Sequence, residues 1–353
     1  MRLLVAGGAG FIGSAFVRRR LVATADSIVV LDKLTYAGNR ENLAEVERDT
    51  RLAPRLRFVK GDIADAVLVR SLMADEAIEG VVNFAAESHV DRSILDAEAF
   101  LRTGVIGVHV LLEAVRERAG EALAAARPAP RLLQVSTDEV YGSLASGASR
   151  ETDPLAPRSP YSAAKAAGEL LVQAYHATYG IDTVVTRGAN TYGPRQHPEK
   201  LIPLFVTNAI DDQPLPLYGD GLQRRDWLHV DDHADAVGFV FDRGEGGGIY
   251  NVAADRERSN REVTAAILDR LGKPWSLVRH VEDRPGHDRR YAMDGSTLAR
   301  LGWRPTMTFD DGLARTVDWY LANEAWWRSL RGGEWAEYYA RQYGRRLAGS
   351  HEV

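Results

Sequence analysis

The chain has 353 residues, and its 44 Lys and Arg against 49 Asp and Glu give a net charge of -5, which offers no reason to expect a nucleic acid or an anionic membrane as a partner. A content of 45% hydrophobic and 26% charged residues is ordinary for a globular protein, and the length predicts two domains or one large domain with an appended lobe. The absence of cysteine excludes disulfides and thiolate metal ligands, and no metal is expected. The first apolar run breaks at Gly7, too early for a signal peptide or a membrane span, so the default expectation is a cytoplasmic protein.

A glycine-rich turn follows the first predicted strand, residues 3–6. The next seven residues, GGAGFIG, place Gly8, Gly10 and Gly13 in the spacing Gly-x-Gly-x-x-Gly, directly before an amphipathic helical pattern. Glycines at these positions allow a tight turn and let backbone N–H groups approach a pyrophosphate at the helix N-terminus. The pattern alone is equally compatible with an ordinary turn.

A second predicted strand, residues 27–32, strengthens the dinucleotide interpretation. It ends in Asp32, about 20 residues beyond the glycines, where an acid hydrogen-bonds the adenosine ribose in NAD enzymes. A carboxylate repels a 2'-phosphate, so NAD is expected rather than NADP, with Lys33 and Arg40 as the nearby cations that argue the other way.

Further strands alternate with helical patterns along the first half of the chain. The segments 56–62, 80–86, 131–136 and 183–187 predict a Rossmann-type α/β fold, a doubly wound parallel sheet. Asp62 is expected either near the adenine or as the cap of a helix over 64–73. Ala85 and Ala86 favour a close approach of the backbone to the cofactor.

The chemistry-bearing residues follow the fifth strand. That strand runs into Ser136 and Thr137 and then two adjacent acids, Asp138 and Glu139, which an acid–base elimination needs in opposite protonation states. The alternative is that the two acids only begin or cap a helix. The Ser-, Gly- and Pro-rich loop over 143–160 is the one candidate lid.

Tyr161 and Lys165 stand four residues apart on a predicted helix that runs to about residue 179, so both side chains share one face. A nearby ammonium and the positive charge of a nicotinamide would lower the Tyr161 pKa toward neutrality, as a general base requires. The alternative is an exposed pair on an amphipathic helix.

Beyond residue 190 the pattern changes to short mixed segments. We expect a Rossmann domain over 1–190, with later sheet strands contributed from about 225–255, and an interleaved smaller C-terminal α/β lobe over 191–353 that binds the substrate. The lobe gathers cations and amides that suit a nucleotide diphosphate: Lys200, Arg224, Arg225, Asn251, Asn260, Arg284, His287, Arg289 and Arg290. Its C-terminal aromatic residues, from Trp326 to Tyr339, are expected to pack on the body or at a subunit contact.

Taken together, these segments resemble a known family, the dTDP-glucose 4,6-dehydratases of the extended short-chain dehydrogenase/reductases, over residues 1 to about 343. The segments 32–39 (DKLTYAGN), 137–139 (TDE) and 283–290 (DRPGHDRR) are the specific ones. The glycine turn and the Tyr161/Lys165 pair mark only the superfamily. Further matching segments are 7–14, 85–93, 198–203 and 225–227.

The resemblance implies a redox-neutral dehydration with tightly bound NAD that is recycled in each turnover. Tyr161, assisted by Lys165 and Thr137, would deprotonate the glucosyl 4-hydroxyl, Glu139 would take the C5 proton, and Asp138 would protonate the departing 6-hydroxyl. The implied cofactor contacts are Gly7, Gly10, Phe11, Ile12, Gly13, Asp32, Lys33, Leu34, Thr35, Gly38, Asp62, Ile63, Ala85, Ala86, Tyr161, Lys165 and Asn190. The implied substrate contacts are Glu87, Ser88, Thr137, Asn190, Lys200, Leu201, Pro216, Tyr218, Arg225, Asn260, His287, Arg289 and Tyr291, with Arg225 on the diphosphate.

The sequence departs from the family pattern in three places. Gly104 stands where an Asn is usual, inside a helix where Gly costs roughly 1 kcal/mol relative to Ala, and it bears on the proton relay. Thr191 and the pair Ala253 and Ala254 bear on substrate identity. The alternatives are therefore the same chemistry on a UDP-linked sugar, or a silent NAD-binding relative; a 4-epimerase would not need Asp138 and Glu139. The resemblance also implies a homodimer through helices 100–118 and 159–179.

Overall fold

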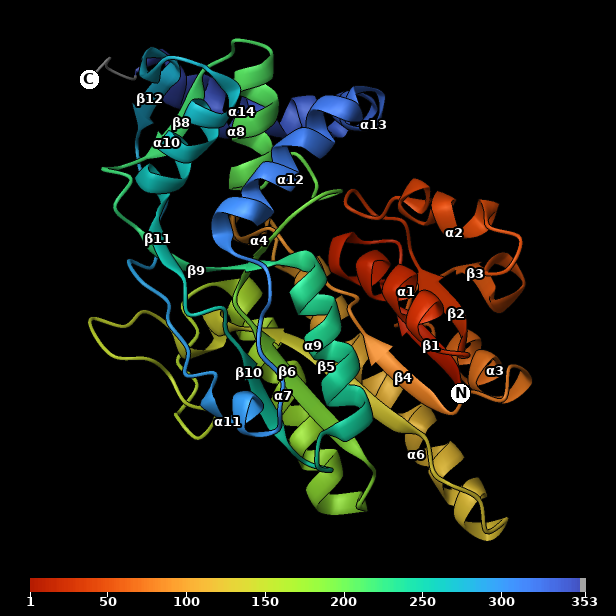
Figure 1. Cartoon of the computed structure of the whole chain (residues 1–353). Helices are drawn as coiled ribbons and strands as arrows, with labels where there is room; N and C mark the ends of the chain where they lie inside the picture. Colours follow the sequence, from red (N-terminus) through yellow and green to blue (C-terminus); the bar gives the residue numbers. More distant parts are fainter. Residues whose placement is uncertain (350–353) are drawn as a thin grey trace.

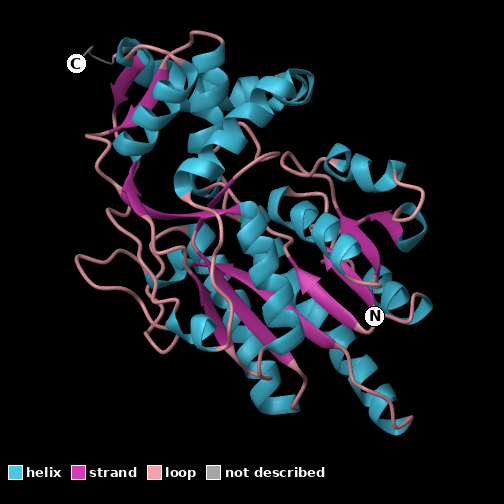
Figure 2. Ribbon diagram, viewed as in Figure 1, coloured by secondary structure: helices cyan, strands magenta, loops and turns pink. Residues whose placement is uncertain are grey.

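The computed structural model describes residues 1–349, and its largest element is a seven-stranded parallel sheet flanked by helices (Figures 1 and 2). The strand order is β10-β6-β5-β4-β1-β2-β3. Every pairing in this sheet is parallel. The strands are β1 (Arg2–Ala6), β2 (Ser27–Asp32), β3 (Leu56–Lys60), β4 (Gly80–Asn83), β5 (Arg131–Thr137), β6 (Thr183–Gly188) and β10 (Ile249–Val252). The predicted doubly wound α/β fold is confirmed.

Helices cover both faces of the sheet. The flanking helices are α1 (Phe11–Ala23), α3 (Ala66–Asp75), α6 (Val108–Ala124), α7 (Pro160–Tyr179) and α9 (Val230–Arg243). Leu3 of β1 packs in one core cluster with residues of α1 and α9, whereas its neighbour Leu4 packs in a second cluster with residues of α3, α6 and α7. Since successive side chains of a strand point to opposite faces, a continuous apolar run such as LLVA is what a sheet covered on both sides requires.

The strand order reverses at β1. From β1 the chain adds β2 and β3 on one side and β4, β5 and β6 on the other, so the carboxyl ends of β1 and β4 form the switch point of the sheet. Ligands of doubly wound sheets bind in the crevice outside this point. The glycine turn lies there, between β1 and the start of α1 at Phe11.

The smaller lobe is built on two further sheets. One contains β11 (Glu257–Ser259), β9 (Arg224–His229) and β7 (Asn190–Tyr192), and the other contains β12 (Val278–Val281) and β8 (Leu215–Tyr218). Of the segment 225–255, expected to add strands to the large sheet, β10 does so, whereas β9 pairs with β7 and β11 instead. The lobe also contains α8 (Leu201–Ile210), α10 (Asn260–Leu271), α12 (Phe309–Ala322), α13 (Glu324–Leu330) and α14 (Glu334–Ala348).

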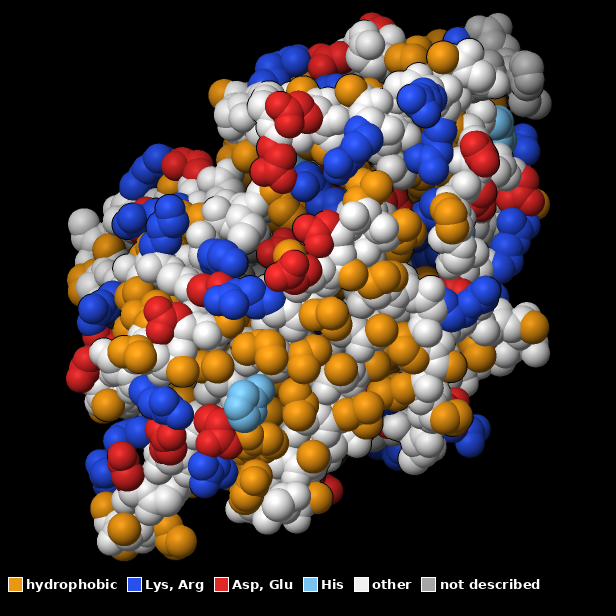
Figure 3. Space-filling view, turned by 180° about the vertical axis from the view of Figure 1, so that it is seen from behind, with side chains coloured by type: hydrophobic (Ala, Val, Ile, Leu, Met, Phe, Trp, Pro, Cys, Tyr) orange, Lys and Arg blue, Asp and Glu red, His pale blue; other side chains and the backbone are white. Residues whose placement is uncertain are grey.

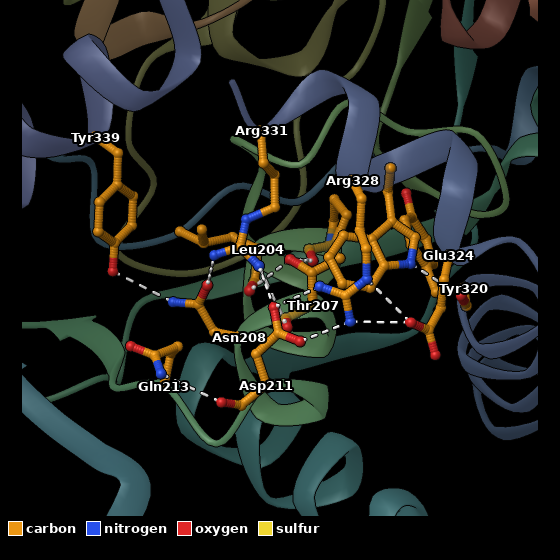
Figure 4. A network of polar contacts seen from close by, with 12 residues as sticks. Leu204, Thr207, Asn208, Asp211, Gln213, Tyr320, Glu324, Arg328, Arg331 and Tyr339 are labelled. Atoms are coloured by element: carbon orange, nitrogen blue, oxygen red, sulfur yellow. Dashed lines mark hydrogen bonds and ion pairs between the residues drawn. The ribbon is translucent and has the colours of Figure 1, made fainter. Parts of the chain in front are cut away.

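The C-terminal helices are fastened to α8 by polar contacts around Asp211 (Figure 4). Arg328 and Arg331 both pair with this carboxylate, at 2.8 and 3.0 Å. Arg331 also donates to the side chain of Asn208 at 3.0 Å. Trp327 is fully buried beneath this network in the core of the lobe, so the C-terminal aromatic residues serve packing.

Two helices differ from the sequence prediction. The helix expected over 100–118 consists of α5 (Glu98–Leu101), a π-helical segment η3 (Arg102–Gly107) and α6. The helix expected from residue 64 begins at Ala66, and its N-cap is Asp65, so the alternative in which Asp62 caps it is wrong. The remaining short helices are α2 (Ala44–Arg48), α4 (Val90–Leu95) and α11 (Ser296–Arg300). Within residues 1–349, no helix has both the length and the apolar character needed to cross a membrane.

Candidate active site

A single cavity runs along the carboxyl edge of the large sheet and contains both predicted chemical centres, the glycine turn and the acid pair. It also takes in Glu87, Ser88 and Lys200 from the predicted substrate contacts. All the predicted cofactor contacts line it except Leu34: Gly7, Gly10, Phe11, Ile12, Gly13, Asp32, Lys33, Thr35, Gly38, Asp62, Ile63, Ala85, Ala86, Tyr161, Lys165 and Asn190. Leu34 contributes through its backbone, because its N–H donates to Asp32 Oδ1 at 2.8 Å.

The glycine turn is packed too closely for side chains. Gly7 has a φ of +72°, and a Cβ placed on it would lie 2.6 Å from the backbone nitrogen of Ala85. A Cβ on Gly13 would lie 2.3 Å from the carbonyl oxygen of Gly7. The start of α1 is therefore pressed against the strand ends, with its free N–H groups at the cavity, which is the arrangement that binds a pyrophosphate.

Asp32 is fixed in the cavity wall by two backbone hydrogen bonds, from Ala9 at 2.9 Å and from Leu34 at 2.8 Å. Each carboxylate oxygen keeps acceptor capacity for a ribose hydroxyl. Lys33 does not stand free beside it, because its ammonium pairs with Asp62 at 3.0 Å. Arg40 is paired with Glu47. These contacts occupy the two cations that could have received a 2'-phosphate, so the residues present fit NAD.

The acid pair begins where β5 ends. The Thr137 hydroxyl accepts the Glu139 N–H at 3.3 Å and donates to Asp138 Oδ1 at 3.1 Å, so Thr137, and not either acid, caps the short helix η4 (Asp138–Tyr141). Burial, together with the neighbouring Glu139 carboxylate, raises the pKa of Asp138 to about 8. Asp138 is thus a carboxylic acid that keeps its proton at neutral pH.

Glu139 lies in different electrostatic surroundings. Burial raises its pKa as well, but three cations oppose the rise, and these are Arg284, Lys200 and Arg225. At Asp138 the charge of Arg225 opposes the rise. The pKa of each acid is therefore raised by burial, and the two differ in the cations that oppose the rise.

Tyr161 and Lys165 project from the first turns of α7, which starts with a capping box between Ser159 and Ser162. The Lys165 ammonium donates to the carbonyl of Val135 at 2.6 Å, and burial lowers its pKa to about 8. Burial raises the pKa of Tyr161, and Glu139 adds to the rise. The protein groups by themselves therefore raise the Tyr161 pKa, because the nearest charges are acids and the Lys165 ammonium is turned to a backbone oxygen; the expected fall includes the positive charge of a bound nicotinamide and stays a prediction.

The predicted substrate residues of the smaller lobe fall into two groups. Arg225 is buried and lies over the ring of Tyr291, 4.4 Å from its centroid. Its charge opposes the rise in the pKa of both acids, Asp138 and Glu139. Tyr218 of β8 packs edge-on against His287. Asn260 and Leu201 stand at the first positions of α10 and α8, and Pro216 lies in β8.

Arg289 lies apart from these residues. It is exposed, and both its terminal nitrogens pair with Asp220 in a separate groove that Arg224, Arg261 and Arg290 also line. The structure therefore does not bring Arg289 to the acid pair.

Three further residues lie near the site, of which Arg284 was expected only as one of the cations of the smaller lobe, whereas Glu199 and His233 were not singled out from the sequence as functional. Arg284 pairs with buried Asp91 at 2.6 Å, which holds it near Glu139. Glu199 is fully buried and pairs with Arg92 at 2.9 Å. His233 of α9 lines the cavity from the far face of the sheet. Local patterns carry no signal for these contacts, because each joins segments distant in the chain.

A hydride-transfer site with an acid and a base in one wall of the same cavity is typical of one class of enzymes. These are the short-chain dehydrogenase/reductases that also eliminate water from a nucleotide sugar. The sequence model of the family described as GDP-mannose 4,6 dehydratase matches residues 4–316. The chain belongs to this family, and within it to the dTDP-glucose 4,6-dehydratases.

The relatives that support this assignment match nearly the whole chain. The dTDP-glucose 4,6-dehydratase of Streptomyces niveus is 50% identical over 94% of this chain and 96% of its own. The structure of DesIV, a dTDP-glucose 4,6-dehydratase from Streptomyces venezuelae with NAD bound, is 53% identical, covers 94% of this chain and 100% of its own, and has a TM-score of 0.87. A UDP-glucose 4-epimerase from Thermus thermophilus, also solved with NAD, is 32% identical over 92% of this chain and 100% of its own, with a TM-score of 0.82.

Proposed function

We propose that this protein is an NAD-dependent dTDP-glucose 4,6-dehydratase that converts dTDP-glucose to dTDP-4-keto-6-deoxyglucose. The observation that carries the proposal is the acid pair, in which Asp138 holds its proton to about pH 8 while three cations face Glu139. A 4-epimerase, the activity named for the relative at 32% identity, oxidises C4 but removes no water. It has no use for an acid beside a base.

NAD, when bound, supplies the hydride acceptor and donor and a positive ring that favours the phenolate of Tyr161. Tyr161 takes the proton of the 4-hydroxyl as the C4 hydrogen leaves as hydride, and Lys165 supports it. The 4-ketone acidifies the C5 proton, which Glu139 accepts. Asp138 gives its proton to the departing 6-hydroxyl, so one water leaves across C5 and C6. Hydride then returns to C6 and Glu139 returns the proton to C5.

One departure from the family pattern, the pair Ala253 and Ala254, lies away from this chemistry. Ala253 and Ala254 are buried in a core cluster, and the Ala254 N–H donates to Asp226 at 2.7 Å. Neither residue lines the cavity. Their methyl groups therefore serve packing, and they give no support to a change of nucleotide.

The first experiment compares dTDP-glucose with UDP-glucose as substrates of the purified protein. The 4-keto-6-deoxy product is followed by its alkali-induced absorbance, and loss of one water is checked by mass. Turnover of the dTDP sugar supports the proposal. Turnover of the UDP sugar alone would keep the mechanism and replace the substrate, and bound NAD without turnover of either sugar would favour the silent-relative alternative.

We also propose that the protein acts in the cytoplasm as a homodimer. Exposed apolar side chains on three elements that pack together support the homodimer. They are Leu101 of α5, Ile106 of η3 and Leu170 of α7, each at least 50% exposed. Hydrophobic side chains gather on this side of the molecule (Figure 3). A contiguous apolar surface of this kind marks an interaction site, and a second copy of the chain is the occupant that the family resemblance implies.

A further inference from the structure

His233, in the first turn of α9, is not among the residues assigned a role above. Its Nδ1 lies 2.7 Å from the Thr191 hydroxyl oxygen, and that hydroxyl lies 3.0 Å from the carbonyl oxygen of Ala189. A carbonyl only accepts, so the Thr191 hydroxyl gives its one proton to Ala189 and accepts the hydrogen bond from His233. Both contacts are satisfied together only when Nδ1 carries a proton, which in a neutral imidazole leaves Nε2 unprotonated. Nε2 then presents a lone pair.

This lone pair is buried and has no hydrogen-bond partner within residues 1–349. The ring lies against Gly188, where a Cβ would come within 2.7 Å of Nε2. Burial lowers the pKa of His233 to about 4, so the ring stays neutral across the physiological range. A buried acceptor without a donor is costly, and a ligand N–H or O–H would relieve that cost.

The position of Gly188 places His233 at the catalytic end of the cavity. Gly188 is the register partner of Thr137 across β5 and β6, whereas Asp32 lies at the opposite end of the cavity on β2. His233 therefore faces the nicotinamide half of a dinucleotide whose adenosine ribose meets Asp32. The donors in that half are the ribose hydroxyls and the carboxamide NH₂.

The two protein groups that could meet these donors, His233 and Lys165, come from opposite faces of the sheet. α9 packs with α1 on one face, while α7, which carries Tyr161 and Lys165, packs with α6 on the other. The Lys165 ammonium has only donors to offer, so it suits the oxygens of the ribose. The imidazole lone pair on the other face suits the carboxamide nitrogen.

We propose that Nε2 of His233 accepts a hydrogen bond from the nicotinamide carboxamide N–H, and that Thr191 holds the ring in the required tautomer. The inference rests on the proposed use of NAD and assigns a positioning residue to it. A fixed carboxamide fixes which face of the nicotinamide meets the sugar, and this reaction needs the same face twice, for the hydride from C4 and for its return to C6. The Thr that replaces a usual Asn at position 191 thus has a defined partner in this chain.

The test compares NAD with 3-acetylpyridine adenine dinucleotide, in which a methyl group replaces the carboxamide NH₂, and with ADP-ribose, which lacks the nicotinamide. Dissociation constants are measured by calorimetry on the cofactor-stripped full chain. In His233→Phe we expect the preference for NAD over the acetylpyridine analogue to fall by about two- to twelve-fold, the size of one neutral hydrogen bond. Affinity for ADP-ribose should not change.

Thr186→Val is the matched control. Its buried hydroxyl also has no hydrogen-bond partner among the described residues, and it stands on the same strand two residues before Gly188, but it does not line the cavity. The preference for NAD should survive in this variant. An unchanged preference in His233→Phe, or an equal loss of affinity for all three ligands, would overturn the proposal.

A second measurement does not depend on a folded variant. In ¹⁵N spectra of the wild-type protein, Nε2 of His233 should have the shift of an unprotonated nitrogen, and it should move with NAD but not with ADP-ribose. A protonated Nε2 would refute the assignment. Wild-type protein that binds NAD and turns over dTDP-glucose while this nitrogen does not respond would refute the His233 contact and leave the proposed function standing.

Discussion

The ammonium of Lys165 donates a 2.6 Å hydrogen bond to the carbonyl of Val135, two residues before Thr137 on β5. This contact fastens the helix that carries Tyr161 to the strand that ends at the acid pair. This one buried contact therefore positions Tyr161, which accepts the 4-hydroxyl proton, relative to the acid pair that acts at C5 and C6. Its disruption affects geometry and charge together.

Lys165→Met should lower kcat by about two to four orders of magnitude, the range of one acid–base contribution. Without the ammonium, the phenolate of Tyr161 loses a favourable charge and the Val135 carbonyl loses its partner. The rising limb of the pH–rate profile should move to higher pH, because the Tyr161 pKa rises further. Lys273→Met, which removes an ammonium paired with Asp212 away from the cavity, is the control and should leave the profile in place. An unmoved profile in Lys165→Met would contradict this role.

Glu139→Gln should abolish product formation while still allowing oxidation of the sugar at C4. The amide cannot accept the C5 proton, so the reaction stops at the 4-keto sugar with reduced cofactor. Reduced nicotinamide should therefore accumulate on the enzyme, followed by its absorbance in single-turnover experiments. Glu257→Gln, whose carboxylate pairs with Arg290 outside the cavity, should turn over normally. Undiminished product from Glu139→Gln would remove Glu139 as the base.

The activity should fall as pH rises through about 8, because Asp138 then loses the proton that it must donate.

The free energy of unfolding should depend on the ionisation of the same carboxyl group. The pKa of Asp138 rises from an ordinary 3.8 in the unfolded chain to about 8 in the folded protein, so its stabilising contribution is complete below the ordinary value and is lost as pH rises toward 8.

Asp138→Asn should remove this pH dependence. Urea unfolding between about pH 5 and pH 8 should show a shallower loss of stability in the variant than in the wild type. Equal slopes would mean that Asp138 ionises normally in the folded protein.

Gly168→Ala should destabilise the protein by about 1–3 kcal/mol. A Cβ at this position of α7 would lie 2.6 Å from the carbonyl oxygen of Gly104, in the π-helical segment η3. Gly120→Ala in α6, where no atom of residues 1–349 beyond its own helix turn lies within 4 Å of the new Cβ, should instead stabilise by up to about 1 kcal/mol through helix propensity. Both are measured by urea unfolding. A neutral Gly168→Ala would show that the two helices separate freely.

Leu170→Arg should weaken self-association without changing the fold, because Leu170 is 56% exposed on the apolar face of α7. Sedimentation velocity should show a dimer for the wild type and a monomer at the same concentration for the variant. Leu222→Arg, on a residue 47% exposed in the smaller lobe, should remain a dimer. A monomeric wild type would refute the dimer proposal.

The sequence by itself determined the parallel strands of the large sheet, although those expected at 56–62 and 80–86 end earlier, at Lys60 and Asn83. The runs at 3–6 and 28–31 are apolar throughout because both faces of those strands are covered, and the glycines at 10 and 13 are dictated by backbone contacts with Gly7, within a short stretch of chain. Local pattern also located Thr137, Asp138 and Glu139 at a strand end. These features depend on neighbours in the sequence, so periodicity and spacing reveal them.

Tertiary structure alone decided the electrostatics of the site. The cations Arg284 and Lys200 reach Glu139 from segments far apart in the chain, and the direction of the Tyr161 pKa depends on which charges burial leaves nearest to it. The placement of Arg289 in a separate groove and the contact of His233 with Thr191 have the same origin. Coulomb interactions and desolvation act through space, and distance along the chain says little about distance in the fold.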